Sequence, residues 1–122
     1  MHINFKGQEL ELSFGFKALD SIDRKLGVEA EQMKFGMGLQ STIPFVLQGN
    51  PITLGEYIIA MTSHHKKHPT ENDVLDVLDD IAENQGLVEF AEELVETLGK
   101  RPSTQSLVPD RFKPAKKDNK KK

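Results

Sequence analysis

Apolar and polar residues alternate along the first part of the chain, which is the pattern of β-strands. Gly7 separates two alternating runs and can take the positive φ that a tight turn requires. The pattern predicts a hairpin with strands over residues 2–5 and 9–13. Because two strands alone are only marginally stable, we expect the hairpin to pack on helices. The alternating apolar residues are Ile3, Phe5, Leu10 and Leu12.

A helical period of three to four residues replaces the alternation from Phe16 onward. The other face of this segment carries charged residues, and Gly27 follows it as the left-handed residue that commonly ends a helix. The period therefore predicts a helix over residues 16–26. Its apolar positions are Phe16, Leu19, Ile22 and Leu26.

The passage from Val28 to Gly38 has mixed polarity and predicts a loop with a short turn. The apolar residues that come next predict a helix to about Gln48. Pro44 lacks a backbone donor, so it should kink this helix or lie in its first turn. The apolar set is Met37, Leu39, Ile43, Phe45, Val46 and Leu47.

Asn50 and Pro51 form a strong helix start, since an Asn side chain accepts from free amides and proline already has a helical φ. The helix that follows is strongly apolar and should be among the best buried. We expect it to end near Ser63. Its apolar residues are Ile52, Leu54, Tyr57, Ile58, Ile59 and Met61.

Two amphipathic helices are predicted after residue 69. Thr70 and Asp73 have the spacing of an approximate capping box, and Gly99 is expected to cap the end of the last helix. A break over residues 84–86 divides the pair. The apolar stripes are Val74, Leu75, Leu78 and Ile81, then Leu87, Phe90, Ala91, Leu94, Val95 and Leu98, and the first stripe lies opposite Asp76, Asp79, Asp80 and Glu83. Together these elements predict an α+β, mainly α fold, with an N-terminal hairpin packed on a bundle of about four to five helices.

Charge divides the chain into two parts. Residues 1–99 carry seven basic and 17 acidic side chains, a net charge of −10, whereas residues 100–122 carry nine basic and two acidic ones, a net charge of +7. The second part also holds three prolines and few apolar residues. We therefore predict a helical domain over 1–99 and a basic, disordered tail over 100–122. A chain of 122 residues is the size of one ordinary domain.

Three histidines, His64, His65 and His68, lie within five residues and raise the question of a metal site. Lys66 and Lys67 lie between them and would repel a cation, and no nearby carboxylate completes a ligand set. Basic residues just after a helix also favour its dipole, which explains the cluster without a ligand. We predict no metal ligand and no cofactor.

Enzymatic signatures are missing from the sequence. The chain has no cysteine, no phosphate-binding glycine loop, no nucleophile elbow and no HExxH helix. The numerous acidic side chains of the last two helices lie opposite the apolar stripes, where solvated charges belong. We therefore predict a protein that is not an enzyme, with no catalytic residues. A small hydrolase that uses these carboxylates is the competing interpretation, and it needs a cleft with perturbed carboxylates.

The N-terminus lacks a basic start followed by an apolar run, and no apolar stretch approaches the length that spans a bilayer. We therefore expect a cytoplasmic protein with no membrane partner. The basic tail could neutralise several phosphates, which makes a small nucleic-acid-associated regulator the alternative function. Nucleic acid remains the less favoured partner, because the tail has one aromatic residue, Phe112, and the acidic body would repel it.

Three stretches resemble the tail assembly chaperones of long-tailed phages and prophages of Gram-positive bacteria. They are INFKGQELELSFGFKALDSIDRKLG at 3–27, GMGLQSTIPFVLQGNP at 36–51 and the PTENDVLDVLDD start of the acidic helix pair. The resemblance covers roughly residues 1–99 and makes this part a helical chaperone-like domain.

The resemblance implies a protein that is needed while the phage tail is built but is absent from the mature virion. It would bind the tape measure protein, help to recruit tail tube subunits, and self-associate, all in the bacterial host cytoplasm. Such a task requires an exposed apolar groove for amphipathic helices of the client. The partner-binding residues remain unknown at this level, because the motifs are structural.

Overall fold

The computed structural model describes residues 1–26 and 37–114. Within them the chain forms a two-stranded hairpin followed by helices, which confirms the predicted α+β, mainly α class. The elements are β1 (His2–Phe5), β2 (Gln8–Glu11), α1 (Phe16–Leu26), α2 (Met37–Leu47), α3 (Pro51–Thr62), α4 (Val74–Asn84), α5 (Leu87–Lys100) and two short 3₁₀ turns, Gln105–Leu107 and Asp110–Phe112.

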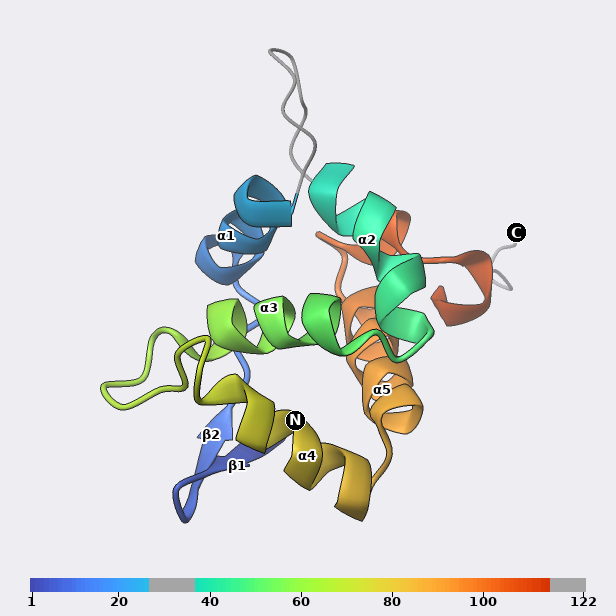
Figure 1. Ribbon diagram of the computed structural model, residues 1–122. Coiled ribbons are helices and arrows are strands. Elements are labelled where there is room, and N and C mark those ends of the chain that lie inside the picture. The colour runs from blue at the N-terminus through green and yellow to red at the C-terminus, as the bar shows by residue number, and fades with distance from the viewer. Residues whose placement is uncertain (27–36, 115–122) are drawn as a thin grey trace, which may run out of the picture.

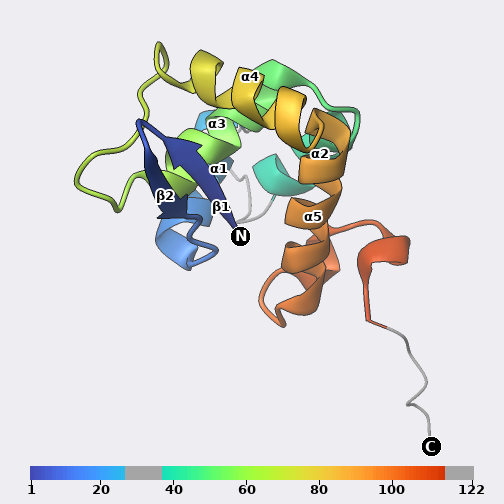
Figure 2. The same cartoon turned by 90° about the horizontal axis from the view of Figure 1, so that it is seen from below.

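The N-terminal hairpin packs on α4, as the sequence predicts. The two strands are antiparallel, with Ile3 opposite Leu10, and both of these side chains are buried. Lys6 and Gly7 form the turn with positive φ values of 50° and 78°. The second strand begins one residue earlier and ends two residues sooner than predicted. The hairpin and the segment after α5 lie on opposite sides of the molecule (Figure 2).

Helix α3 lies near the middle of the fold, with α1 and α2 on one side and α4 on the other (Figure 1). Tyr57 of α3 is fully buried, and its hydroxyl is 2.7 Å from Thr42 Oγ1 of α2. Burial raises the pKa of Tyr57 well above its usual value. The Tyr57–Thr42 hydrogen bond ties α2 to α3 within the apolar core.

Helix α2 begins at Met37, the first residue of the predicted apolar set, so it includes the last two residues of the predicted loop. Gly38 was expected in a loop but lies in the first turn of α2, where Asp23 of α1 supplies the cap. The buried Asp23 carboxylate accepts from the backbone N–H groups of Gly38, at 2.6 Å, and Leu39, at 3.1 Å. Pro44 lies in the interior of α2 rather than in its first turn. Gly27 and the predicted loop as far as residue 36 lie outside the described residues.

The helix starts differ in how well local sequence predicts them. Asn50 caps α3 as expected, accepting from the Thr53 backbone N–H at 3.0 Å, and Pro51 is the first helical residue. Helix α4 begins at Val74, later than the predicted capping box. There Asp73 accepts from both the backbone N–H and the hydroxyl of Thr70, at 3.1 and 3.0 Å. The bond from the Thr70 backbone N–H to Asp73 is one of the two bonds of the predicted capping box, whereas the Thr70 hydroxyl binds the Asp73 side chain instead of a backbone N–H of α4.

Residues 100–114 differ from the predicted disordered tail. They fold back on α5, with Thr104 and Val108 buried, and the Thr104 hydroxyl donates to the Leu98 carbonyl oxygen at 2.6 Å. Gly99 is not the predicted helix cap but a buried residue within α5. A Cβ at this position would collide with the carbonyl oxygen of Phe112. Residues 115–122, the rest of the predicted tail, lie outside the described part.

Several residues of the predicted apolar stripes face outward. Those that are exposed are Phe16, Met37, Phe45, Ile52 and Leu75. Val88, which no predicted stripe included, is also exposed, whereas Val77, which the predicted stripe omitted, is buried. None of the helices among the described residues is long and apolar enough to cross a membrane.

Candidate partner-binding groove

Two of the most exposed apolar side chains, Ile52 of α3 and Leu75 of α4, line the same groove. Ile52 is 72% exposed and Leu75 is 59% exposed, although both were expected in the core. The groove has a volume of about 210 Å³ and runs between the two helices. Its other lining residues are Pro51, Gly55, Glu56, Ile59, Glu71, Val74 and Leu78.

The floor of the groove is formed by Gly55 of α3 and by Val74 and Leu78 of α4. A Cβ at Gly55 would lie 3.4 Å from Leu78 Cδ1 and 3.5 Å from Val74 Cγ1, which is ordinary van der Waals contact, so Gly55 faces these two side chains of α4 directly. Val74 and Leu78 are buried and continue into the core. The floor is therefore fixed by core packing, while the walls at Ile52 and Leu75 remain open to solvent.

One end of the groove is charged. Lys25 of α1 places its Nζ 3.1 Å from Glu56 Oε1 and 2.9 Å from Glu71 Oε2. The hydrogen bond to Glu71 is the main cause that raises the pKa of Lys25, and the same bond lowers the pKa of the Glu71 carboxyl. Lys25 and Glu71 therefore hold each other in their charged forms at neutral pH. Two carboxylates share one ammonium, which leaves one net negative charge.

The two walls of the groove have the same order of residues. Helices α3 and α4 lie side by side and run in opposite directions (Figure 1). On α3, Glu56 follows Ile52 by one helical turn, and on the other wall Glu71 precedes Leu75 by the same spacing. The groove therefore has an apolar part bounded by Ile52 and Leu75 and a charged end at Glu56 and Glu71.

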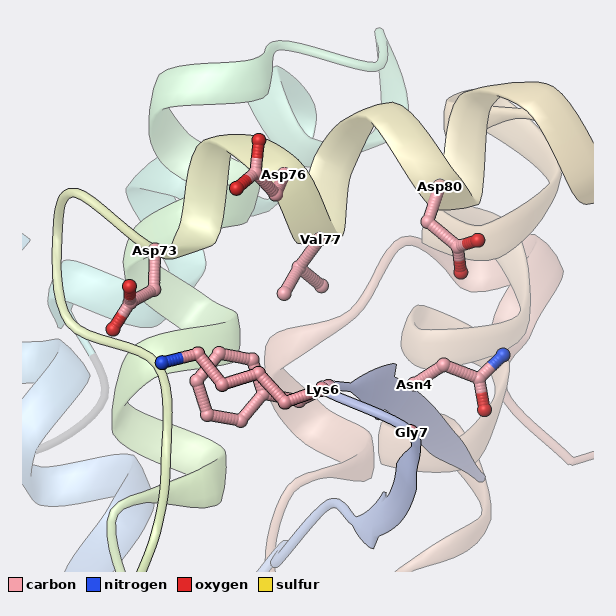
Figure 3. Close-up of a pocket in the computed structure, with 8 residues that line it drawn as sticks. Asn4, Lys6, Gly7, Asp73, Asp76, Val77 and Asp80 are labelled. Atoms are coloured by element: carbon pink, nitrogen blue, oxygen red, sulfur yellow. The ribbon is translucent and has the colours of Figure 1, made fainter.

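A second hollow lies between the hairpin turn and α4, with a volume of about 340 Å³. Three carboxylates, those of Asp73, Asp76 and Asp80, line it, and Lys6 points toward Asp73 (Figure 3). Hydrogen bonds from the Thr70 backbone and hydroxyl lower the pKa of Asp73, and the charge of Lys6 adds to this effect. A general acid needs a raised pKa, so Asp73 is shifted in the wrong direction for acid catalysis.

The three histidines of the α3–α4 connection do not converge. His65 Nε2 is 2.8 Å from the carbonyl oxygen of Glu11, and His68 Nδ1 is 3.4 Å from that of Pro69. The rings of His64 and His65 have centroids 4.0 Å apart and planes tilted by 41°. Over residues 1–26 and 37–114, no set of three potential ligands could hold a metal ion.

Part of the basic C-terminal region is paired with acids of the same chain. Arg111 Nη2 lies 3.8 Å from Glu92 Oε2 of α5, and Lys113 Nζ lies 3.2 Å from Asp110 Oδ1. The guanidinium of Arg111 also lies over the Phe112 ring, 4.1 Å from its centroid. These two cations therefore belong to the folded body.

Sequence reasoning identified no partner-binding residue, and the groove explains why. Ile52 and Leu75 were assigned to buried stripes because they are apolar and correctly spaced. One signal of an exposed apolar surface was present in the α4 sequence. Its apolar positions, Val77 included, form a stripe around the helix that is wider than one neighbouring helix or hairpin can cover. Val77 lines the hollow beside the hairpin, Val74 and Leu78 form the groove floor, and Leu75 at the edge of the stripe remains uncovered.

A model of the family described as "Phage tail assembly chaperone protein, TAC" matches residues 2–112. The match includes the hairpin, the groove and the segment that folds back on α5. No curated protein and no solved structure gives a significant match.

Proposed function

This chain belongs to the phage tail assembly chaperone family, and we propose that it binds the tape measure protein through the groove between α3 and α4. In this proposal the chain acts in the cytoplasm of a bacterial host, without catalysis, and is absent from the finished virion. The observation that carries the proposal is the pair of exposed apolar walls, Ile52 and Leu75, above a buried apolar floor.

The groove suits an amphipathic helix as its occupant. Such a helix inserts apolar side chains at i, i+3, i+4 and i+7 into a groove of this kind. Ile52 and Leu75 would be covered by the client, and the floor at Gly55 and Leu78 needs no rearrangement because core packing already holds it. A long tape measure protein offers many such segments, and covering their apolar faces would keep it from aggregating before the tail tube forms.

Recruitment of tail tube subunits requires a surface that stays accessible when the groove is filled. The groove is lined by residues of α3, of α4 and of the turn before α4, and among the described residues none of α5 or of the hairpin lines it. We propose that tube subunits, and further copies of this chain, bind outside the groove. This arrangement lets one chaperone bind the tape measure protein and tail tube subunits at the same time.

Co-expression with the tape measure protein tests the proposal. The wild-type chain should keep the client in solution and co-purify with it, whereas the Ile52→Ser and Leu75→Ser variants should each lose most of the recovered client. Phe16→Ser is the matched control, since Phe16 is similarly exposed on α1 but does not line the groove. Circular dichroism of each variant checks that the fold is intact.

Two results would contradict the proposal. Equal recovery of client with the groove variants and with wild type would remove the groove as the binding site. Micromolar, salt-sensitive binding to duplex DNA, lost when residues 115–122 are deleted, would instead favour the nucleic-acid-associated regulator.

A further inference from the structure

The charged end of the groove carries more negative than positive charge. Glu56, whose side chain is only 19% exposed, and the exposed Glu71 face a single ammonium, that of Lys25. Lys25 Nζ donates a hydrogen bond to Glu71 Oε2 at 2.9 Å, whereas its 3.1 Å contact with Glu56 Oε1 is an ion pair without hydrogen-bond geometry. Carboxylate oxygens accept more than one hydrogen bond each, so the pair retains capacity for a second cation.

We propose that the groove selects an amphipathic helix that carries a Lys or Arg about one turn beyond its apolar anchors. The apolar side chains lie between Ile52 and Leu75, and the cation binds Glu56 and Glu71 beside Lys25. Lys25 serves as the internal cation of the unoccupied groove. The inference rests on the proposed function and adds to it the chemistry of the bound segment.

The spacing of the walls supports this occupant. On each wall the carboxylate is four residues from the exposed apolar side chain in sequence, within α3 for Glu56 and in the turn before α4 for Glu71, and both carboxylates lie at Lys25. A helix lying along the groove presents side chains at the same interval, so an anchor and a cation four residues apart reach both features. Partial burial of Glu56 strengthens the attraction, because the charge is less screened there than on the open surface.

Charge outside the groove also favours a basic segment over an acidic one. Residues 1–99 carry a net charge of −10, so the acidic body repels a helix with a negative flank. This long-range effect acts on any cation and does not by itself place one. Placement requires Glu56 and Glu71, and the experiment must therefore separate the local pair from the overall charge.

Two designed peptides provide the probe. Each has about 18 residues, or five helical turns, with the same leucine stripe, and they differ only in bearing Lys or Glu one turn beyond the stripe. Fluorescence anisotropy measures the dissociation constants of both peptides for the full-length chain. We expect the Lys peptide to bind about tenfold more tightly than the Glu peptide.

Two variants should move this preference in opposite directions. Glu71→Gln removes one carboxylate and should reduce the preference for the Lys peptide about threefold, whereas Lys25→Met removes the internal cation and should increase it about threefold. Opposite signs cannot come from misfolding, which weakens both peptides together. Glu83→Gln on the exposed face of α4 makes the same change in net charge outside the groove and should leave the preference unchanged.

The inference is overturned if Glu71→Gln and Lys25→Met leave the preference unchanged, or if Glu83→Gln alters it as much as Glu71→Gln does. It is also overturned if the wild-type chain forms a dimer through the groove that neither peptide displaces. If one of these results is obtained but Leu75→Ser still fails to recover the tape measure protein, the proposed function stands and only the preference for a basic helix is wrong. If Leu75→Ser binds both peptides as wild type does and keeps the client, the groove itself is the wrong site.

Discussion

Two helix surfaces of this protein contain a glycine that faces a neighbouring segment, and they differ in what covers them. Around Gly99 of α5 the chain covers itself, because the segment that ends at Phe112 passes directly over the glycine. Around Gly55 of α3 the close neighbour is α4, and the groove above the contact stays open. Val108 is buried on the covered surface, whereas Leu75 is exposed beside the open one.

The difference separates the roles of the two surfaces. A surface covered by the chain's own residues contributes to stability, since apolar burial there is complete in the free protein. An apolar surface left open costs stability and solubility, so it usually marks a site for a partner. Changes around Gly99 should therefore alter the free energy of unfolding, and changes on the groove walls should alter binding instead.

The largest expected effect is on the free energy of unfolding, and it distinguishes a residue on the floor of the groove from one on its wall. Leu78 is 6% exposed, so Leu78→Ala should lower the free energy of unfolding by about 2–4 kcal/mol through lost burial and a residual cavity. Leu75→Ala, three residues away on the same helix, should change it by less than about 0.5 kcal/mol. Urea denaturation measures both values. Similar losses for the two leucines would show that Leu75 is part of the core and that the groove is not open.

Deleting the chain after Lys100 should have the next largest effect. It removes the buried Val108 side chain and the Thr104–Leu98 hydrogen bond, so the free energy of unfolding should fall by about 2 kcal/mol. The matched control is deletion after Pro114, which keeps all of these contacts and should leave the urea midpoint unchanged. An unchanged midpoint after the longer deletion would mean that the 100–114 segment adds no stability.

Replacing Gly99 or Gly55 by alanine should change the free energy of unfolding by unequal amounts. Gly99→Ala forces the Phe112 carbonyl oxygen away and should cost roughly 1–2 kcal/mol, after allowance for the better helix propensity of alanine. At Gly55 the nearest atom is the flexible end of Leu78, at 3.4 Å, so Gly55→Ala should be neutral or stabilise by up to about 1 kcal/mol. Thermal unfolding compares the two variants directly, and equal losses would remove the distinction between the surfaces.

Sequence patterns predicted the elements whose causes are local. The helical period gave α1 its bounds, and Asn50 with Pro51 marked the start of α3, because the residues that fix these features are neighbours in sequence. The cap of α2 was missed because Asp23, which supplies it, lies fifteen residues before Gly38. Gly99 looked like a helix cap for a related reason: the segment that needs the space returns from residue 112.

The groove could not be predicted because exposure depends on neighbours that a pattern does not reveal. Ile52 and Leu75 are apolar at helical spacing, which is equally compatible with a core position and with a binding surface. Their exposure follows from the packing of α3 against α4, in which Gly55 faces Val74 and Leu78 and the two walls lie outside the contact. The exposed walls became visible only when both helices were placed.

The smallest expected effect concerns the charged end of the groove and its dependence on pH. The ion pair with Lys25 lowers the pKa of Glu71 in the folded state below its ordinary value of 4.5, so the contribution of Glu71 to stability is present above that value. It is lost as the pH falls through the lower folded pKa, where the carboxyl takes up a proton. Comparing urea denaturation of wild type and Glu71→Gln from about pH 6 to about pH 3 should show a smaller loss of stability in the variant.

Asp73 titrates over the same acid range, because its pKa is also lowered, but its partner is Thr70, outside the groove. An Asp73→Asn control should therefore reduce the acid sensitivity of stability without changing the binding of a basic helix. Glu71→Gln should change both. If the two variants behave alike in binding, the ion pair at the end of the groove acts on stability alone, and only the apolar walls distinguish the open surface from the covered one.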